Sequence, residues 1–388
     1  MAIRVNPKLI DELAVFGAED VSKCYHCGNC SATCPFSKEP YIFPRRSMRF
    51  LQMGLQKKLE GSLEPWLCYY CGECSEDCPR DAEPGETMMS LRRWLTSRYD
   101  FTGISRLFYR SGKIELIAVI IGAILTGLGF VLWGMSKGSI YNYDGPNAFM
   151  PADSIHIFDW GLAGVLLALL LTNCARMWWF SIGRDRSIHV PITSYVKKAY
   201  LLPMHFVTQM RYAKCERKYP WAIHLGLVVS YVIMLVLIMF FLRTFQPGPD
   251  IPWRMHVFGY IATAGLLGAS IFAIQARIRK SAPQYEHSHE TDWIFLALLV
   301  FVAFTGILQH ILHRTGLDMA ANITYIVHMM GVVPMLGLEV PFSKWAHLAY
   351  RPLAMYFADV RADALAVVDE RLTPVPAPQM VVAERRHG

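Results

Sequence analysis

Two runs of cysteine have the spacing of iron–sulfur ligands. Each run reads C-x2-C-x2-C-x3-C-P, the first over residues 24–35 and the second over residues 68–79. In this pattern three thiolates bind one cluster and the fourth binds the neighbouring cluster. The sequence therefore predicts two [4Fe–4S] clusters and one-electron transfer. The expected ligands are Cys24, Cys27, Cys30 and Cys78 for the first cluster and Cys68, Cys71, Cys74 and Cys34 for the second.

Other uses of cysteine fit this pattern less well. A four-thiolate zinc site pairs its cysteines two by two, so a triplet followed by a spaced Cys-Pro would leave ligands unused. Cysteines so close in sequence rarely meet the geometry of a disulfide. Cys174 and Cys215 remain outside the two runs; the first is expected to be a buried apolar residue and the second a free thiol in a basic loop.

Histidines in strongly apolar surroundings form a second set of candidate ligands. Ionisable residues inside membrane segments are costly and are functional candidates by default. His224 and His347 are expected at one depth on antiparallel helices, where two opposed neutral imidazoles are a common axial ligation of haem b. His328 lies further into the membrane, in the last apolar segment, and is a candidate ligand of a second haem. Its partner stays open among His256, His310, His156 and Met234.

Long apolar segments must position these histidines. Of the 388 residues, 53% are hydrophobic and only 18% are charged, and the apolar excess lies after residue 113. Six segments there approach the roughly 20 residues that cross a bilayer core. They are expected at 114–135, 155–175, 220–242, 255–276, 293–312 and 319–338. The first begins too far from the N-terminus to be a signal peptide.

Basic residues are distributed unevenly among the connecting loops. They are frequent before the first segment and in the second and fourth loops, and sparse in the other three. The positive-inside rule then places both termini and the cysteine-rich region in the cytoplasm of a prokaryotic cell, at its inner membrane. The net charge of +7 follows from this bias, and no nucleic-acid partner is expected.

The fold class predicted from these patterns is all-α. A small helical ferredoxin domain with two clusters is expected at residues 1–97, an amphipathic linker at 98–113, a six-span cytochrome b type bundle at 114–350 and a cytoplasmic tail at 351–388. Apolar residues at helical spacing predict one helix over 44–59, between the cysteine runs, and another over 86–98. Pro334 and Pro341 predict a kink between His328 and His347.

The residues also carry a family resemblance. The region from Cys24 through Pro-Arg-Arg-Ser-Met-Arg-Phe-Leu-Gln-Met-Gly-Leu to Cys78-Pro-Arg resembles the C-type iron–sulfur subunit of heterodisulfide reductases. The region from His224 to Pro-Phe-Ser-Lys-Trp-Ala-His347 resembles the cytochrome b (gamma) subunit of respiratory nitrate reductase. Their fusion is similar to the C-type subunit of quinone-interacting membrane-bound oxidoreductase complexes.

This resemblance implies a set of cofactors and partners. It implies haem b, a menaquinone or ubiquinone site, two cytoplasmic flavoprotein partners similar to the A-type flavoprotein of heterodisulfide reductases, and electron exchange with adenylylsulfate reductase in dissimilatory sulfur metabolism. The chain departs from the nitrate reductase pattern at Met234, where that family has a histidine, and in the spacing of 19 between His328 and His347 where the family has 18. Both departures concern the second haem.

The function predicted is that of a quinone-linked oxidoreductase subunit. No glycine fingerprint of a nucleotide site occurs in the sequence, so no substrate active site is expected apart from the quinone site. Arg243, Lys344 and Arg351 fit either quinone ligands or interfacial anchors. Two alternatives stay open: a haem-free membrane anchor or redox sensor, and the equivalent subunit of a membrane heterodisulfide or sulfite-pathway reductase.

Overall fold

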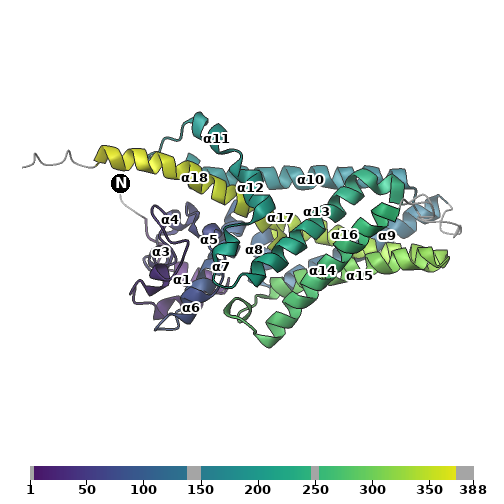
Figure 1. Ribbon diagram of the computed structural model, residues 1–388, viewed down its shortest axis with the longest axis horizontal. Helices are drawn as coiled ribbons and strands as arrows, with labels where there is room; N and C mark the ends of the chain where they lie inside the picture. The colour runs from purple at the N-terminus through teal and green to yellow at the C-terminus, as the bar shows by residue number, and fades with distance from the viewer. Residues whose placement is uncertain (1–3, 138–149, 246–252, 373–388) are drawn as a thin grey trace, which may run out of the picture.

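The computed structural model describes residues 4–137, 150–245 and 253–372. Within these residues the protein is helical, and its only strand-like pairing is an isolated bridge between Lys38 and Tyr41. The all-α prediction is confirmed. The N-terminal helices form a compact domain at one end of a bundle of long helices (Figure 1).

Six helices of the bundle are long and apolar enough to cross a membrane, which confirms the predicted number among the described residues. They are α9 (Gly112–Ser136), α10 (Ala152–Trp178), α13 (Tyr219–Phe245), α14 (Trp253–Arg279), α15 (Glu290–Arg314) and α16 (Asp318–Pro334). Large apolar side chains such as Ile117, Leu125 and Phe240 are exposed on the outer surfaces of these helices. Such surfaces suit contact with lipid acyl chains.

The last membrane segment is interrupted before it leaves the bundle. Pro334 ends α16, and Met335–Glu339 form a π-helical turn before the short α17 (Val340–Phe342). Pro341 lacks the N–H group that a continuous helix would use. A 3₁₀ turn follows, and α18 (His347–Leu372) begins at His347.

Short helices build the N-terminal domain. They are α1 (Leu9–Ala14), α2 (Asn29–Ala32), α3 (Arg45–Gln52), α4 (Gln56–Glu60), α5 (Glu64–Leu67) and α6 (Glu73–Glu76). Met48, Leu51 and Leu59 are fully buried, as the helical spacing predicts. The single helix expected over 44–59 is instead divided into α3 and α4.

Gly54 accounts for that division. Its φ of 64° lies in the left-handed region, and a Cβ atom there would come within 2.4 Å of the Asn6 carbonyl oxygen. The Asn6 N–H donates to the Gly54 carbonyl at 2.8 Å. Because only glycine allows this turn and this contact, the chain reverses between the two helices.

Two helices connect the domain to the bundle. α7 (Pro84–Tyr99) contains the helix expected over 86–98, and the expected linker forms α8 (Ile104–Arg110). The side chain of Arg176 on α10 donates to the carbonyl groups of Arg98 and Tyr99 at 3.0 and 2.7 Å. The end of α7 is thus fixed to the second membrane segment.

α18 runs from the bundle along the N-terminal domain (Figure 1). Arg361 donates to the Gly61 carbonyl at 3.2 Å, and the Ala358 carbonyl accepts from the Tyr41 hydroxyl at 2.9 Å. On its other side α18 packs against α11 (Ile192–Lys198) and α12 (Leu201–Thr208). The boundary predicted at residue 350 falls inside this helix, and residues 373–388 of the predicted tail lie outside the described residues.

Candidate functional site

Four cysteines line one small cavity of the N-terminal domain. They are Cys24, Cys27, Cys30 and Cys78, the set expected for the first cluster. Gly28 adopts a φ of 92° and directly precedes the short helix α2, which carries Cys30. The turn therefore directs the first three cysteines to one side, where Cys78 of the second run meets them.

The second run repeats the same local structure. Gly72 has a φ of 89° and directly precedes α6, just as Gly28 precedes α2. The two short helices contact each other, and the Asn29 side chain donates to the Asp77 carbonyl at 2.6 Å. Cys68 and Cys71 lie close enough to Cys34 and Cys74 to act on their ionisation. The remaining four predicted ligands thus gather in a second group.

The thiols in these groups are hard to ionise without a bound cation. Burial raises the pKa of Cys34 to about 12 and that of Cys30 to about 11, and neighbouring cysteines contribute to both shifts. A thiolate is the form that binds metal, and a bound metal deprotonates its thiol ligand. The donor set therefore fits iron–sulfur clusters, whose iron would supply the missing positive charge. Among the described residues, no three His, Cys, Asp or Glu side chains are grouped to hold a single ion.

Hydrogen bonds reach the sulfur atoms of the second run. The Tyr70 N–H donates to the Cys68 sulfur at 3.3 Å, and the Ala82 N–H donates to the Cys78 sulfur at 3.4 Å. Cys215, from the loop before α13, is buried and lies within hydrogen-bonding distance of Cys71. The sequence predicts only a free thiol at Cys215, because nothing in its local sequence indicates that this loop reaches the cluster domain.

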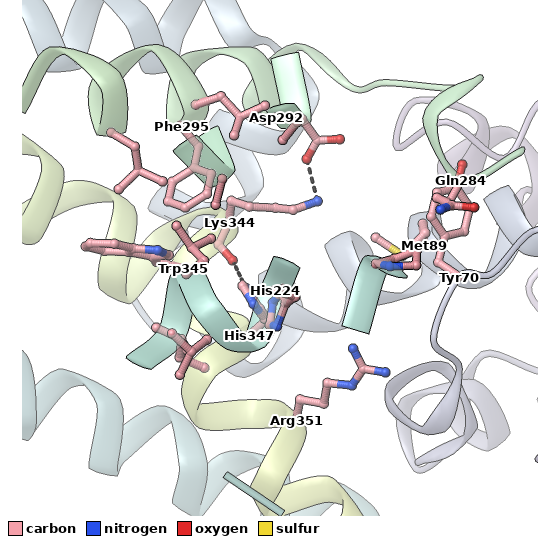
Figure 2. A pocket seen from close by; sticks show the side chains of 18 of the residues that line it. Tyr70, Met89, His224, Gln284, Asp292, Phe295, Lys344, Trp345, His347 and Arg351 are labelled. Atoms are coloured by element: carbon pink, nitrogen blue, oxygen red, sulfur yellow. Dashed lines mark hydrogen bonds and ion pairs between the residues drawn. The ribbon is translucent and has the colours of Figure 1, made fainter. Parts of the chain in front are cut away.

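An inner cavity of about 250 Å³ lies where the N-terminal domain meets the bundle. His224 on α13 and His347 at the start of α18 both line it and lie close together (Figure 2), with ring centroids 6.2 Å apart and ring planes inclined by 52°. Metal–imidazole bonds of about 2 Å on opposite sides of one ion would place the centroids about 6 Å apart. The distance between the two rings would therefore suit two imidazole ligands of one metal ion.

The outer nitrogen of each of these two rings already has a partner. His224 Nδ1 lies 2.7 Å from the Gln209 amide oxygen, and His347 Nδ1 donates to the Lys344 carbonyl. With Nδ1 as donor, Nε2 of each ring carries a free lone pair. Metal-binding histidines are oriented in this way, because the second hydrogen bond fixes both tautomer and ring direction.

Five cations line the inner cavity. They are Arg92, Arg93, Arg277, Lys344 and Arg351. Lys344 forms an ion pair with Asp292 (Figure 2). Arg93 forms one with Glu86 at 2.8 Å. Burial is the main cause that lowers the pKa of Arg92, to about 9. A haem carries two carboxylates, and cations are suitable partners for such groups.

The backbone of a predicted cluster ligand lies beside this cavity. Arg92 and Arg351 both donate to the Cys68 carbonyl, the latter at 2.7 Å. The Arg351 guanidinium also lies 3.7 Å from the centre of the Tyr69 ring, and Tyr69 stacks on Tyr212 at 5.1 Å. Arg351 lies one helical turn after His347. A few contacts thus connect the second cysteine group with the opposed histidines.

An outer cavity of about 430 Å³ lies deeper in the bundle. His328 and His256, the residues expected for the second haem, both line it, as do His310 and Met234. His328 Nδ1 contacts the Thr305 hydroxyl at 3.0 Å, and its ring lies against Gly306. His256 packs on His310 with centroids 5.1 Å apart.

Other polar partners hold the remaining outer histidines. The Tyr260 hydroxyl bonds His310 at 2.9 Å, the Trp160 indole donates to His156 at 3.0 Å, and His313 pairs with Asp318 at 3.1 Å. The outer cavity therefore offers several histidines, and the partner of His328 stays open. The side chain of Arg243, a predicted quinone ligand or anchor, lies outside the described residues.

Comparison with known proteins identifies the N-terminal domain. A family model described as a 4Fe-4S dicluster domain matches residues 20–82. The C-type iron–sulfur subunit of CoB–CoM heterodisulfide reductase from Methanopyrus kandleri is 35% identical over 71 residues, which are 16% of this chain and 37% of that protein. The chain thus spans little more than a third of that relative. No solved structure matches the chain.

These matches agree with the geometry of the cysteines. The N-terminal part of the chain is a ferredoxin-like 4Fe-4S dicluster domain, and it is weakly similar to an iron–sulfur protein of heterodisulfide reductase. The family match ends before α7, so of the inner cavity it includes only Trp66, Tyr69 and Tyr70, and it includes none of the membrane helices. The chain is therefore an iron–sulfur electron-transfer protein, and the part of it that the structure describes contains six helices that could span a membrane.

Proposed function

We propose that this chain is a membrane subunit that passes electrons between the quinone pool and cytoplasmic flavoproteins. The electrons would travel through haem b and the two [4Fe–4S] clusters. The observation that carries the proposal is the inner cavity, because it unites the opposed rings of His224 and His347 with residues of the cluster domain. Distance controls electron transfer between cofactors, so a shared cavity favours this route.

A haem in the inner cavity would have its iron between His224 and His347. Bound there, it would supply a one-electron carrier that separates the two electrons of a quinol. Gln209 and the Lys344 carbonyl orient the two rings, and the buried cations stabilise acidic groups in the cavity. Arg351 holds the Cys68 backbone beside the same space.

A second haem in the outer cavity would use His328, with His256 as its first candidate partner. The apolar lining of this cavity suits a macrocycle. A quinone in the bilayer would exchange electrons beside the outer cavity or near Lys344 and Arg351. The haems and clusters are expected only to carry electrons; none of them would form or break bonds in a downstream substrate.

The partners proposed come from the family resemblance. Two flavoproteins similar to the A-type flavoprotein of heterodisulfide reductases would dock on the cytoplasmic cluster domain, and adenylylsulfate reductase would exchange electrons with them. The similarity to the Methanopyrus kandleri protein supports a multisubunit redox complex. The same similarity favours, as a second candidate, the equivalent subunit of a membrane heterodisulfide reductase.

The test is the cofactor content of the purified full-length chain. We expect b-type haem bands in the reduced-minus-oxidised spectrum and about eight cluster irons with matching acid-labile sulfide. A protein with clusters but no haem would instead be the membrane anchor or redox sensor. Zinc without labile sulfide would contradict the cluster assignment itself.

A further inference from the structure

Two buried carboxyl groups lie at the end of the bundle nearest the cluster domain. Glu115 is in the first turn of α9, and Glu339 ends the π-helical turn that follows α16; neither side chain is exposed. Their carboxyl groups lie within hydrogen-bonding distance of each other. π-turns occur frequently at functional sites.

This pair lacks the partners that two buried charges would need. Ser343 donates to one oxygen of Glu115, and the groups near Glu339 that could donate to it include the Ser343 hydroxyl and the Lys344 N–H, neither of which carries a charge. Within the described parts of the chain, neither carboxylate forms an ion pair with a lysine, arginine or histidine. Ionised carboxylates are acceptors only, so a hydrogen bond between the two requires a proton on one of them.

Charged groups surround the pair on several elements. Asp292 and Glu290 on α15 add negative charge near Glu115, and Lys344 is already engaged by Asp292. Tyr109 on α8 is the group between the pair and the inner cavity: it lines that cavity, and burial together with Glu115 and Glu339 raises its pKa. Arg93 on α7 is close to Tyr109 but forms its ion pair with Glu86.

The pair is also connected to the opposed histidines by a short segment. Ser343, which donates to Glu115, precedes Lys344, whose carbonyl accepts from His347. Only a few residues of low-dielectric interior separate the inner cavity from the carboxyl pair. A change of charge in the cavity therefore changes the electrostatic energy of a proton on the pair.

We propose that Glu115 and Glu339 form a proton-binding site linked to the redox state of the inner cavity. The pair holds one shared proton when the cavity is oxidised and binds a second, taken from water, when a quinol-derived electron enters; that second proton leaves on reoxidation. The redox link rests on the proposed function, whereas the shared proton does not depend on any haem.

Infrared spectroscopy of the purified full-length chain tests the shared proton directly. At neutral pH, the oxidised wild-type protein should show a carboxylic-acid C=O band that shifts in D₂O and is absent from Glu339→Gln and Glu115→Gln. The isosteric substitutions keep a hydrogen-bonding side chain at each position. Glu286→Gln, at an exposed position in the loop between α14 and α15, is the matched control and should retain the band. A band that persists in both pair variants, or is missing from the wild type, overturns the site.

A redox titration tests the linkage. If haem is present, its midpoint potential at the inner cavity should fall as pH rises, and Glu339→Gln should reduce that dependence by at least half. An unchanged dependence in Glu339→Gln overturns the linkage. A chain without haem would refute the proposed function but would still give a clear infrared result on the shared proton.

Discussion

The inner and outer cavities of the bundle contain the same type of candidate ligand in different arrangements. In the inner cavity, two imidazoles face each other and each Nδ1 has an oxygen partner, so both Nε2 atoms are free for one ligand. In the outer cavity, His328 Nδ1 contacts Thr305 and His310 bonds Tyr260, while His256 packs on His310 and its Nδ1 has no hydrogen-bond partner among the described residues. Histidine content alone therefore does not indicate a haem site, and we predict haem binding where two rings lie close together and each Nδ1 has an oxygen partner.

The two cavities also differ in their neighbours. The inner cavity is lined by five cations and by residues of the cluster domain, whereas the outer cavity is mainly apolar. We therefore expect changes at the inner cavity to affect both haem and clusters, and changes at the outer cavity to affect haem alone.

Removing an inner ligand should have the largest effect. His347→Ala leaves His224 without an opposed ring, so about half of the haem should be lost if each cavity binds one. Haem content by pyridine haemochrome, normalised to iron–sulfur content, measures this. His287→Ala, at an exposed loop histidine, is the control and should leave haem unchanged. Full haem content in His347→Ala would refute the inner pair.

Substitutions at the outer cavity should resolve the open partner of His328. His328→Ala is expected to remove the second haem while the inner signal and the clusters remain. Of His256→Ala, His310→Ala and Met234→Leu, the true partner should reproduce this loss and the other two should only shift the spectrum. Low-temperature reduced spectra distinguish the two signals. If His328→Ala retains both haem signals, the outer cavity does not bind haem, and the two cavities differ in function as well as in arrangement.

Arg351 connects the inner cavity to the second cysteine group. Arg351→Met keeps much of the length of the side chain but removes the hydrogen bond to the Cys68 carbonyl and the charge over Tyr69. Loss of a hydrogen bond from a charged donor costs about 1–3 kcal/mol. We expect a lower thermal midpoint and an altered EPR spectrum of one cluster. Arg217→Met, on the exposed ion pair with Glu76, is the matched control and should change neither.

Glu60 helps to hold the cluster domain against the bundle, and its loss should have the smallest effect. Burial raises the pKa of Glu60, but hydrogen bonds from Arg184 and Gln56 and the charge of Arg98 outweigh it, so the net pKa lies below its ordinary value of 4.5. The bond to Arg184 ties the cluster domain to the bundle at 2.9 Å. A lowered folded-state pKa gives stability that is present at neutral pH and is lost as pH falls below about 4.5.

Glu60→Gln should therefore lower stability by about 1–2 kcal/mol at pH 7 and by less at pH 4. Thermal unfolding followed by cluster absorbance measures both. An equal loss of stability at the two pH values would show that the charge of Glu60 does not stabilise the contact between the cluster domain and the bundle.

Local patterns in the sequence were sufficient to predict the cysteine-rich domain and the membrane-length helices, but not every helix boundary. The two cysteine runs predict the dicluster domain because their spacing is set by the cluster, and the apolar segments predict six spans because the bilayer sets their length. Gly54 divides a predicted helix because its contact with Asn6 is distant in sequence. α18 extends past residue 350 because it packs on both domains, which local polarity does not reveal.

Contacts between distant segments account for what the sequence could not predict at the site. His224 and His347 could be paired by depth, but the acceptors on their Nδ1 atoms come from Gln209 and Lys344, in two irregular connections. Cys215 and the Glu115–Glu339 pair were missed for the same reason. Each depends on a loop or turn that meets a remote element.

The inner cavity is proposed to connect the membrane to the clusters. The most direct measurement uses the full-length chain in liposomes that contain a long-chain quinone, after reduction with dithionite and removal of the excess. EPR then follows reoxidation of the clusters in the wild type and in His347→Ala. We predict reoxidation in the wild type and a decrease of at least tenfold in its rate in the variant. Equal rates of cluster reoxidation in the two proteins would contradict electron transfer through the inner cavity.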